Sequence, residues 1–142
     1  LTDSSAASDV YKRQVFFLLM VKHFVCDFAL QGRFKEKHDK HLVSSTKGHL
    51  HALDHAVGTA LVFLFVASYA FAQGQTIFVT ILLFPILDYV LHFFIDWCKN
   101  NFVHHNNLFQ HDRSFWILTS VDQCLHAFTY FVFVILFDIY LI

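Results

Sequence analysis

The chain has 142 residues, of which 56% are hydrophobic and only 15% are charged, and its formal net charge is −1. Nineteen phenylalanines and a single proline fit lipid-facing helices better than a soluble domain with many loops. This composition excludes a nucleic-acid-binding protein, which would carry a basic surface, and it leaves room for one small domain. Membrane lipids are therefore the expected partners.

The first fourteen residues, LTDSSAASDVYKRQ, are polar and join abruptly to an apolar run that begins at Val15. The stretch from Asp9 to Gln14 matches the translation of a common sequencing adaptor. We therefore interpret residues 1–14 as an adaptor artefact, with a disordered natural leader as the alternative, and leave them out of the fold prediction. The remaining residues, 15–142, are predicted to form one transmembrane domain.

Hydropathy predicts four membrane-spanning helices, because a bilayer core requires about 20 predominantly apolar residues per helix. The predicted helices run from about Val15 to Gln31, Leu50 to Gln73, Thr76 to Lys99, and Ser114 to the C-terminus. Pro85 lies inside the third helix and is expected to kink it. The predicted fold class is an all-α, integral membrane four-helix bundle. A soluble four-helix protein is the alternative, because the apolar runs are interrupted.

The charges of the three connections predict the orientation in the membrane. The first connection carries an excess of basic residues: Arg33, Lys35, Lys37, Lys40 and Lys47. The third connection carries Lys99 and Arg113, whereas the second, around Gly74, has no charge. The positive-inside rule then places the first and third connections in the cytoplasm and both termini on the outer side.

Each predicted helix carries one pair of metal-capable residues four positions apart. The pairs are His23 and Asp27, His51 and His55, His92 and Asp96, and Asp122 and His126. This spacing places both members of a pair on one helix face. In the predicted topology all four pairs lie near the cytoplasmic side of the membrane. Because ionisable residues inside a membrane are costly and usually mark function, we predict one shared polar site in the bundle interior.

Imidazole and carboxylate groups on facing helices suit a divalent transition metal such as zinc, manganese or iron. Eight potential ligands exceed the needs of one ion and could hold two, with open positions for water or substrate. Such a centre could activate water for attack on a phosphate ester or an amide. Gln31, Lys99 and Gln123 would then be supporting or substrate-orienting groups. Two alternatives remain open from the sequence: a hydrogen-bonded structural network, and a proton or ion path.

Four segments of the sequence resemble the signatures of domain of unknown function 3307, a family of small integral membrane proteins from bacteria and their phages. They are HFVCDFALQ (His23 to Gln31), HALDH (His51 to His55), HFFIDWCK (His92 to Lys99) and VDQCLH (Val121 to His126). The resemblance covers nearly all of the chain after Gln14. It implies the bacterial inner membrane as the location, including for a phage-encoded protein, but no particular activity. Asp54 stands where such proteins are expected to carry an apolar residue, so its participation in the site is not expected.

The functional hypothesis is a membrane-embedded, metal-dependent hydrolase that acts on a lipid or lipid-linked substrate. The alternative is a non-enzymatic membrane protein: a small transporter, a proton path, or a phage accessory factor of the envelope. An enzyme requires an accessible cleft beside the site, whereas a transporter requires a polar route to the outer face. Asp88, Tyr89 and Asp138 are the only candidates for such a route.

Other residues of interest receive simpler interpretations. Two tryptophans, Trp97 and Trp116, are expected to anchor the helices at the cytoplasmic interface. The three cysteines are an odd number, which argues against a disulfide framework, and are expected to be small buried residues: Cys26, Cys98 and Cys124. Three histidines are expected in the solvated third connection: His104, His105 and His111.

Overall fold

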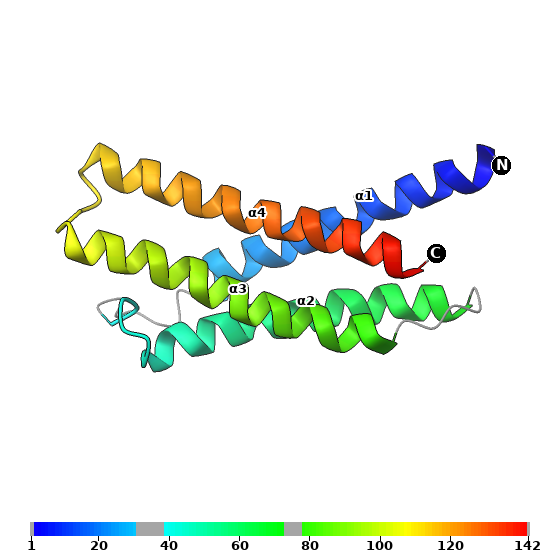
Figure 1. The fold of residues 1–142 in the computed structure, drawn as a ribbon, viewed down its shortest axis with the longest axis horizontal. Helices are drawn as coiled ribbons and strands as arrows, with labels where there is room; N and C mark the ends of the chain where they lie inside the picture. The colour runs from blue at the N-terminus through cyan, green and yellow to red at the C-terminus, as the bar shows by residue number, and fades with distance from the viewer. Residues whose placement is uncertain (1, 31–38, 73–77, 142) are drawn as a thin grey trace.

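The computed structural model describes residues 2–30, 39–72 and 78–141. Within these ranges the chain forms four α-helices and one π-helix and no strand: α1 (Thr2–Phe24), η1 (Val25–Leu30), α2 (Thr46–Ala72), α3 (Phe78–His105) and α4 (Arg113–Leu141). The helices lie roughly along one long axis, with both termini at the same end of the molecule (Figure 1). The predicted all-α, four-helix fold is confirmed.

Three of these helices are long and apolar enough to cross a membrane, over Thr46–Ser68, Ile81–His105 and Arg113–Ile139. α1 is not among them in the described part of the chain. Its first half is the polar stretch before the apolar run, and it carries Lys22 and His23 further along. The prediction of four spanning helices is thus supported for three.

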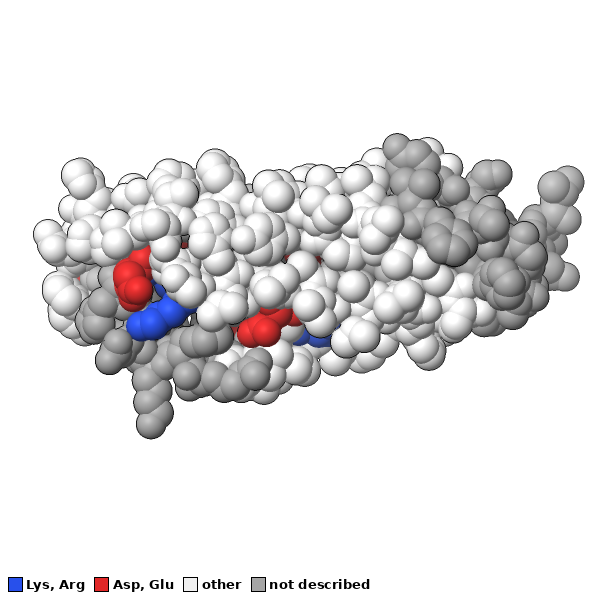
Figure 2. Space-filling view, turned by 90° about the horizontal axis from the view of Figure 1, so that it is seen from below, with Lys and Arg blue, Asp and Glu red and all other residues white. Residues whose placement is uncertain are grey.

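The exterior of the bundle is apolar, which fits a membrane protein. Large apolar side chains on every α-helix are exposed, among them Phe17, Phe65, Ile86 and Phe128. On the face shown in Figure 2, charged side chains of the described residues appear in only a few places. In water such a surface would be an extended apolar patch, whereas in a bilayer it is matched to the lipid tails.

The start of α2 differs from the predicted boundary because of a cap. The helix begins at Thr46 rather than Leu50, and the Ser45 hydroxyl accepts a hydrogen bond from the backbone N–H of Gly48 at 3.1 Å. A serine at this position satisfies one of the free N–H groups of the first turn. The cap extends α2 beyond its apolar run and fixes the segment that precedes it.

The end of α3 also differs, since the helix continues past Lys99 to His105. It ends in a Schellman-type turn, in which Asn107 has a positive φ of 50° and the Leu108 N–H donates to the Val103 carbonyl at 3.0 Å. Two of the histidines predicted to lie in a loop, His104 and His105, therefore belong to α3. The third, His111, lies in the connection to α4 and is exposed.

The interior has two halves along the bundle axis. We call one the aromatic half, since it holds four buried phenylalanine rings among aliphatic residues: Val15, Leu19, Val62, Phe63, Val66, Phe84, Phe133, Val134 and Phe137. We call the other the polar half: Lys22, His23, His51, His55, Thr59, Asp88, His92, Asp122, His126 and the Tyr130 hydroxyl. The polar half lies toward the start of α2 and the end of α3, away from the two termini.

The cysteine prediction is wrong for two of the three residues. Cys26 is buried, but Cys98 and Cys124 are exposed. They lie two positions after Asp96 and Asp122, respectively, so they are on nearly the opposite face of each helix from the polar interior.

Candidate metal centre

The eight paired residues meet in one cluster inside the polar half, and Asp27 on η1 organises its first part. The Asp27 Oδ1 atom lies 3.0 Å from His55 Nε2 and 3.2 Å from His51 Nε2. The Oδ2 atom lies 3.5 Å from His23 Nε2. One carboxylate therefore faces three imidazoles that come from α1 and α2. The π-helix that carries Asp27 is a geometry often found at functional sites.

Asp96 on α3 organises the second part of the cluster. Its Oδ1 atom lies 3.5 Å from His126 Nε2, and its Oδ2 atom lies 3.7 Å from His51 Nε2. Asp122 on α4 also approaches His126, with 3.6 Å between Oδ1 and Nε2. Because His51 approaches both Asp27 and Asp96, the contacts form one continuous cluster rather than two separate ones. The predicted convergence of the pairs is thus found in the structure.

His92 lies between the two parts and has unusual surroundings. Its side chain is only 1% exposed, and its ring stacks between those of His55 and His126, with centroid distances of 3.5 and 4.1 Å. Neither ring nitrogen of His92 has a hydrogen-bond partner among the described residues. Leaving a buried polar group unsatisfied costs about 1–3 kcal/mol, so such a group calls for an explanation, such as a bound ion.

Two sets of ligand atoms in the cluster are close enough to share an ion. In each set the atoms lie within 4.8 Å of one another, and His92 belongs to both: Asp27, His51, His55 and His92, and then His92, Asp96 and His126. Imidazole nitrogens with carboxylate oxygens are suitable ligands for zinc, manganese and iron. The described residues therefore fit one such ion, or two that share His92. His23 and Asp122, also predicted as ligands, flank these sets.

Gln123 and Lys99, predicted as supporting groups, are hydrogen-bonded to members of the cluster. The Gln123 carbonyl accepts a hydrogen bond from His23 Nε2, and its amide donates to Asp27 Oδ2, both at 3.2 Å. Lys99 Nζ donates to Asp122 Oδ2 at 2.8 Å. Gln31, the third residue predicted for this role, lies outside the described residues. Asp54 is in neither ligand set.

Four residues that were not predicted as site residues extend the cluster by one further turn. Lys22 forms a buried ion pair with Asp88, donates to the Tyr130 hydroxyl at 2.8 Å, and lies 3.4 Å from His55 Nδ1. Thr59 donates to Asp88 Oδ2 at 2.6 Å. This second network therefore contacts the side of His55 that faces away from Asp27.

The same spacing rule could have found three of these four residues. Each lies four positions from a member of a pair: Thr59 from His55, Asp88 from His92, and Tyr130 from His126. Lys22 does not follow the rule, and its position depends on a close approach of two helices. A Cβ atom at Gly58 would lie 3.0 Å from Lys22 Cγ, so the glycine leaves room for the lysine side chain.

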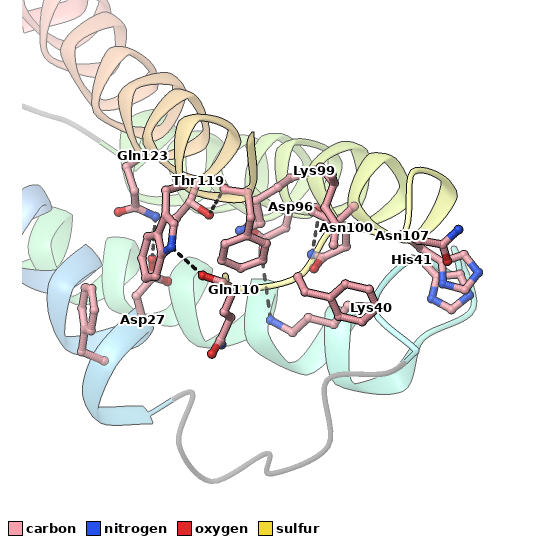
Figure 3. A pocket seen from close by; sticks show the side chains of 17 residues that line it. Asp27, Lys40, His41, Asp96, Lys99, Asn100, Asn107, Gln110, Thr119 and Gln123 are labelled. Carbon is pink, nitrogen blue, oxygen red and sulfur yellow. Dashed lines mark hydrogen bonds and ion pairs between the residues drawn. The ribbon is translucent and has the colours of Figure 1, made fainter. Parts of the chain in front are cut away.

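A cavity of about 630 Å³ adjoins the cluster at the end of the bundle away from the termini. Asp27, Asp96 and Gln123 form part of its wall, and Lys40 and Lys99 approach Asp96 from two sides (Figure 3). The Lys40 Nζ atom lies 3.6 Å from Asp96 Oδ2, and Lys99 Nζ lies 3.7 Å from Asp96 Oδ1. The cluster is therefore accessible from a space large enough for a small ligand.

The rim of the cavity is fixed by contacts between the loops and the helices. The Trp97 indole donates to the His41 carbonyl at 3.0 Å, and Trp116 donates to the Gln110 carbonyl at 2.7 Å. The His41 ring stacks on His104 with 3.8 Å between the centroids. Both tryptophans, predicted as interface anchors, thus hold the segments that surround the opening.

The fold and the site together define a class: an all-α protein with membrane-spanning helices around a buried histidine and aspartate cluster. The chain belongs to the family described as protein of unknown function (DUF3307), whose model matches residues 15–141. The resemblance inferred from the four motifs is therefore confirmed. Neither the search of curated proteins nor that of solved structures gave a match. The family description gives no activity, so the function must be argued from the site.

Proposed function

We propose that the protein is a metal-dependent hydrolase of the bacterial inner membrane, encoded by a bacterium or a phage, that acts on a lipid or lipid-linked substrate. The observation that carries the proposal is His92, a buried imidazole within reach of two ligand sets and without a hydrogen-bond partner among the described residues. A divalent ion would give one of its ring nitrogens a partner. The cavity beside Asp27 and Asp96 gives substrate access to the same groups.

The free energies involved argue against hydrogen bonding alone as the reason for these polar residues. Hydrogen bonds between helices in a membrane contribute about 0.6 kcal/mol on average. Placing an aspartate near the centre of a spanning helix costs about 2.5–3.5 kcal/mol. A polar network with no role other than stability would therefore make the bundle less stable than apolar residues at the same positions. A site that acts on a substrate explains the cost.

The chain's own residues would divide the work as follows. Asp27, His51, His55 and His92 would hold one ion, which supplies the Lewis acidity that activates water or polarises a scissile ester. Gln123 keeps Asp27 oriented through its amide, as the hydrogen bond at 3.2 Å indicates. The apolar exterior would allow a lipid to reach the cavity while its chains stay in the bilayer.

The test uses His92→Phe, which keeps the stacked ring and removes both nitrogens. Elemental analysis of wild-type protein, purified in detergent without chelator, is expected to show stoichiometric zinc, manganese or iron. The variant is expected to lose at least about 10–100-fold in metal affinity. His49→Phe is the matched control, because His49 stacks on Phe93 and bonds to Tyr89 outside both ligand sets. Wild-type protein that contains no metal and takes up none would overturn the proposal and leave a structural network.

The transport alternative receives less support from the structure. The contacts of Asp88 lead back to the cluster through Lys22, and the Tyr89 hydroxyl bonds to His49. Beyond them the described core of the aromatic half is apolar, up to the Lys12–Asp138 ion pair near the far end. We therefore favour a site that opens on one side only.

The orientation follows from the positive-inside rule and has its own test. A reporter enzyme fused after Asn106 is expected to be cytoplasmic, whereas one fused after Ile139 is expected to be external. The loops around Lys37 and Gly74, which carry the same prediction, lie outside the described residues. An external signal from the Asn106 fusion would reverse the orientation without affecting the metal centre.

A further inference from the structure

The charges of the described residues around the cavity are nearly balanced in the absence of an ion. Three carboxylates, on Asp27, Asp96 and Asp122, face two ammonium groups, on Lys40 and Lys99. Lys22 and Asp88 neutralise each other deeper in the bundle. With neutral histidines, the cluster and the two lysines therefore carry one excess negative charge.

A divalent ion would reverse this balance. One ion converts the excess to one positive charge, and a second ion would make the cluster more positive still. Uncompensated charge in a poorly hydrated interior is costly, so a filled cluster requires an anion nearby. The two lysines are on the cavity side of the cluster, which is where such an anion would enter.

The positions of the two lysines suit an anion that binds between them. Both lie against Asp96, with Nζ–O distances of 3.6 and 3.7 Å, and Lys99 also donates to Asp122 at 2.8 Å, so an anion would meet the two ammonium groups beside these carboxylates. Lys40 is only 6% exposed, although it belongs to a connecting segment. A lysine buried at the wall of a cavity is well placed as a point charge for phosphate.

Part of the cavity lining is apolar and aromatic, and we call it the aromatic wall: Phe28, Phe109, Phe115 and Trp116. Cavities that hold a whole small molecule are typically about 300–1,000 Å³, far more than a phosphate ion occupies. Resting on the metal centre proposed above, we propose that the cavity binds a phosphate ester. Lys40 and Lys99 hold the phosphate, and an apolar chain of the same molecule lies on the aromatic wall.

The experiment measures binding of two probes to zinc-loaded protein in a neutral detergent. Dodecyl phosphate is expected to bind at least about ten-fold more tightly than inorganic phosphate, because only the former reaches the aromatic wall. Equal affinities for the two probes would support binding of the phosphate group alone and would contradict the proposal that an apolar chain lies on the aromatic wall. Dodecyltrimethylammonium, which carries the opposite charge, is expected not to compete.

Lys40→Met is expected to weaken dodecyl phosphate binding about ten-fold or more with zinc content unchanged, and Lys40→Arg to retain it. Lys47→Met is the matched control, since Lys47 pairs with Asp39 away from the cavity. By thermodynamic reciprocity, dodecyl phosphate is expected to raise the affinity for zinc by the same factor by which zinc raises the affinity for dodecyl phosphate.

The outcomes separate this inference from the proposed function. Zinc-loaded wild-type protein that binds dodecyl phosphate no better than Lys40→Met would overturn the phosphate site and leave the metal centre standing. Protein that binds the probe equally well with and without zinc would overturn the argument from charge reversal. Protein that takes up no zinc would overturn both, and the zinc content alone identifies that case.

Discussion

The two halves of the bundle interior are held together by opposite kinds of contact. In the aromatic half, Phe63 stacks on Phe84 at 4.6 Å, and Phe137 meets Phe63 edge to face at 5.3 Å. In the polar half, charged and hydrogen-bonding groups occupy the equivalent interior positions. Helices surrounded by lipid gain little from apolar transfer, so close packing stabilises the first half. Because close packing alone can hold helices together in a membrane, the costly contacts of the second half are the ones that the proposed site would explain.

The largest expected effect on stability comes from Asp88→Ala, which leaves the buried Lys22 ammonium without its carboxylate. Removing one partner of a buried ion pair typically costs about 3–5 kcal/mol. Thermal unfolding in detergent would measure the loss. The double variant Lys22→Met, Asp88→Leu is expected to recover most of it. If the single variant is as stable as the wild type, the polar half tolerates an unpaired charge. The contrast that we draw between the two halves would then be wrong.

Phe84→Ala tests the aromatic half. Phe84 is fully buried against Phe63 and Phe133, so its truncation leaves a cavity. We expect a loss of about 3 kcal/mol, the lower end of the range for soluble cores, because lipid removes part of the transfer contribution. Metal content is expected to remain at the wild-type level. A loss of metal would show that the two halves are not independent.

Gln123→Ala tests the support of the ligands, since the amide contacts both His23 and Asp27. We expect metal affinity to fall about 10–100-fold, as is usual when a group that orients a ligand is removed. Competition with a fluorescent chelator would measure it. The melting temperature of metal-free protein should change little. The reverse result, a large loss of stability with full metal affinity, would favour a structural network.

The smallest expected effect is that of Thr59→Val, which removes one hydrogen bond to Asp88 at nearly constant volume. Hydrogen bonds of this kind in membranes contribute about 0.6 kcal/mol, and at most about 1.7 kcal/mol. The free energy of unfolding of this single variant would show how much one such hydrogen bond contributes to stability in the polar half. A loss above that range would mean that these contacts contribute more to stability than we infer.

The fold was largely predictable because apolar runs determine where helices cross a membrane. The helix boundaries were not predictable, since they depend on single residues such as Ser45 and Asn107. The capping roles of these residues depend on the backbone conformation of the neighbouring turn, which the apolar runs do not indicate. The π-helix Val25–Leu30 was not predicted either, because its sequence continues the run that begins at Val15 without a break in composition.

The candidate site was predictable where it follows helical periodicity and not where it depends on tertiary contact. The four pairs met as their spacing required. Lys40 was counted only among the basic charges of the first connection, yet it packs beside Asp96. Lys22 lies on the interior side against Gly58 of α2, where a Cβ atom would come within 3.0 Å of the lysine Cγ. Neither position can be derived from one helix considered alone.

The ion pair between Lys22 and Asp88 also has a consequence for the order of biogenesis. The two residues are 66 positions apart, so α1 leaves the ribosome well before its partner in α3 has been made. α1 is also the helix that is not apolar enough, over its described residues, to span a membrane by itself. We therefore expect α1 to remain near the membrane surface until α3 has inserted. Chains truncated at Ala72 should leave Cys26, on η1 directly after α1, accessible to a water-soluble thiol reagent, whereas full-length chains should protect it.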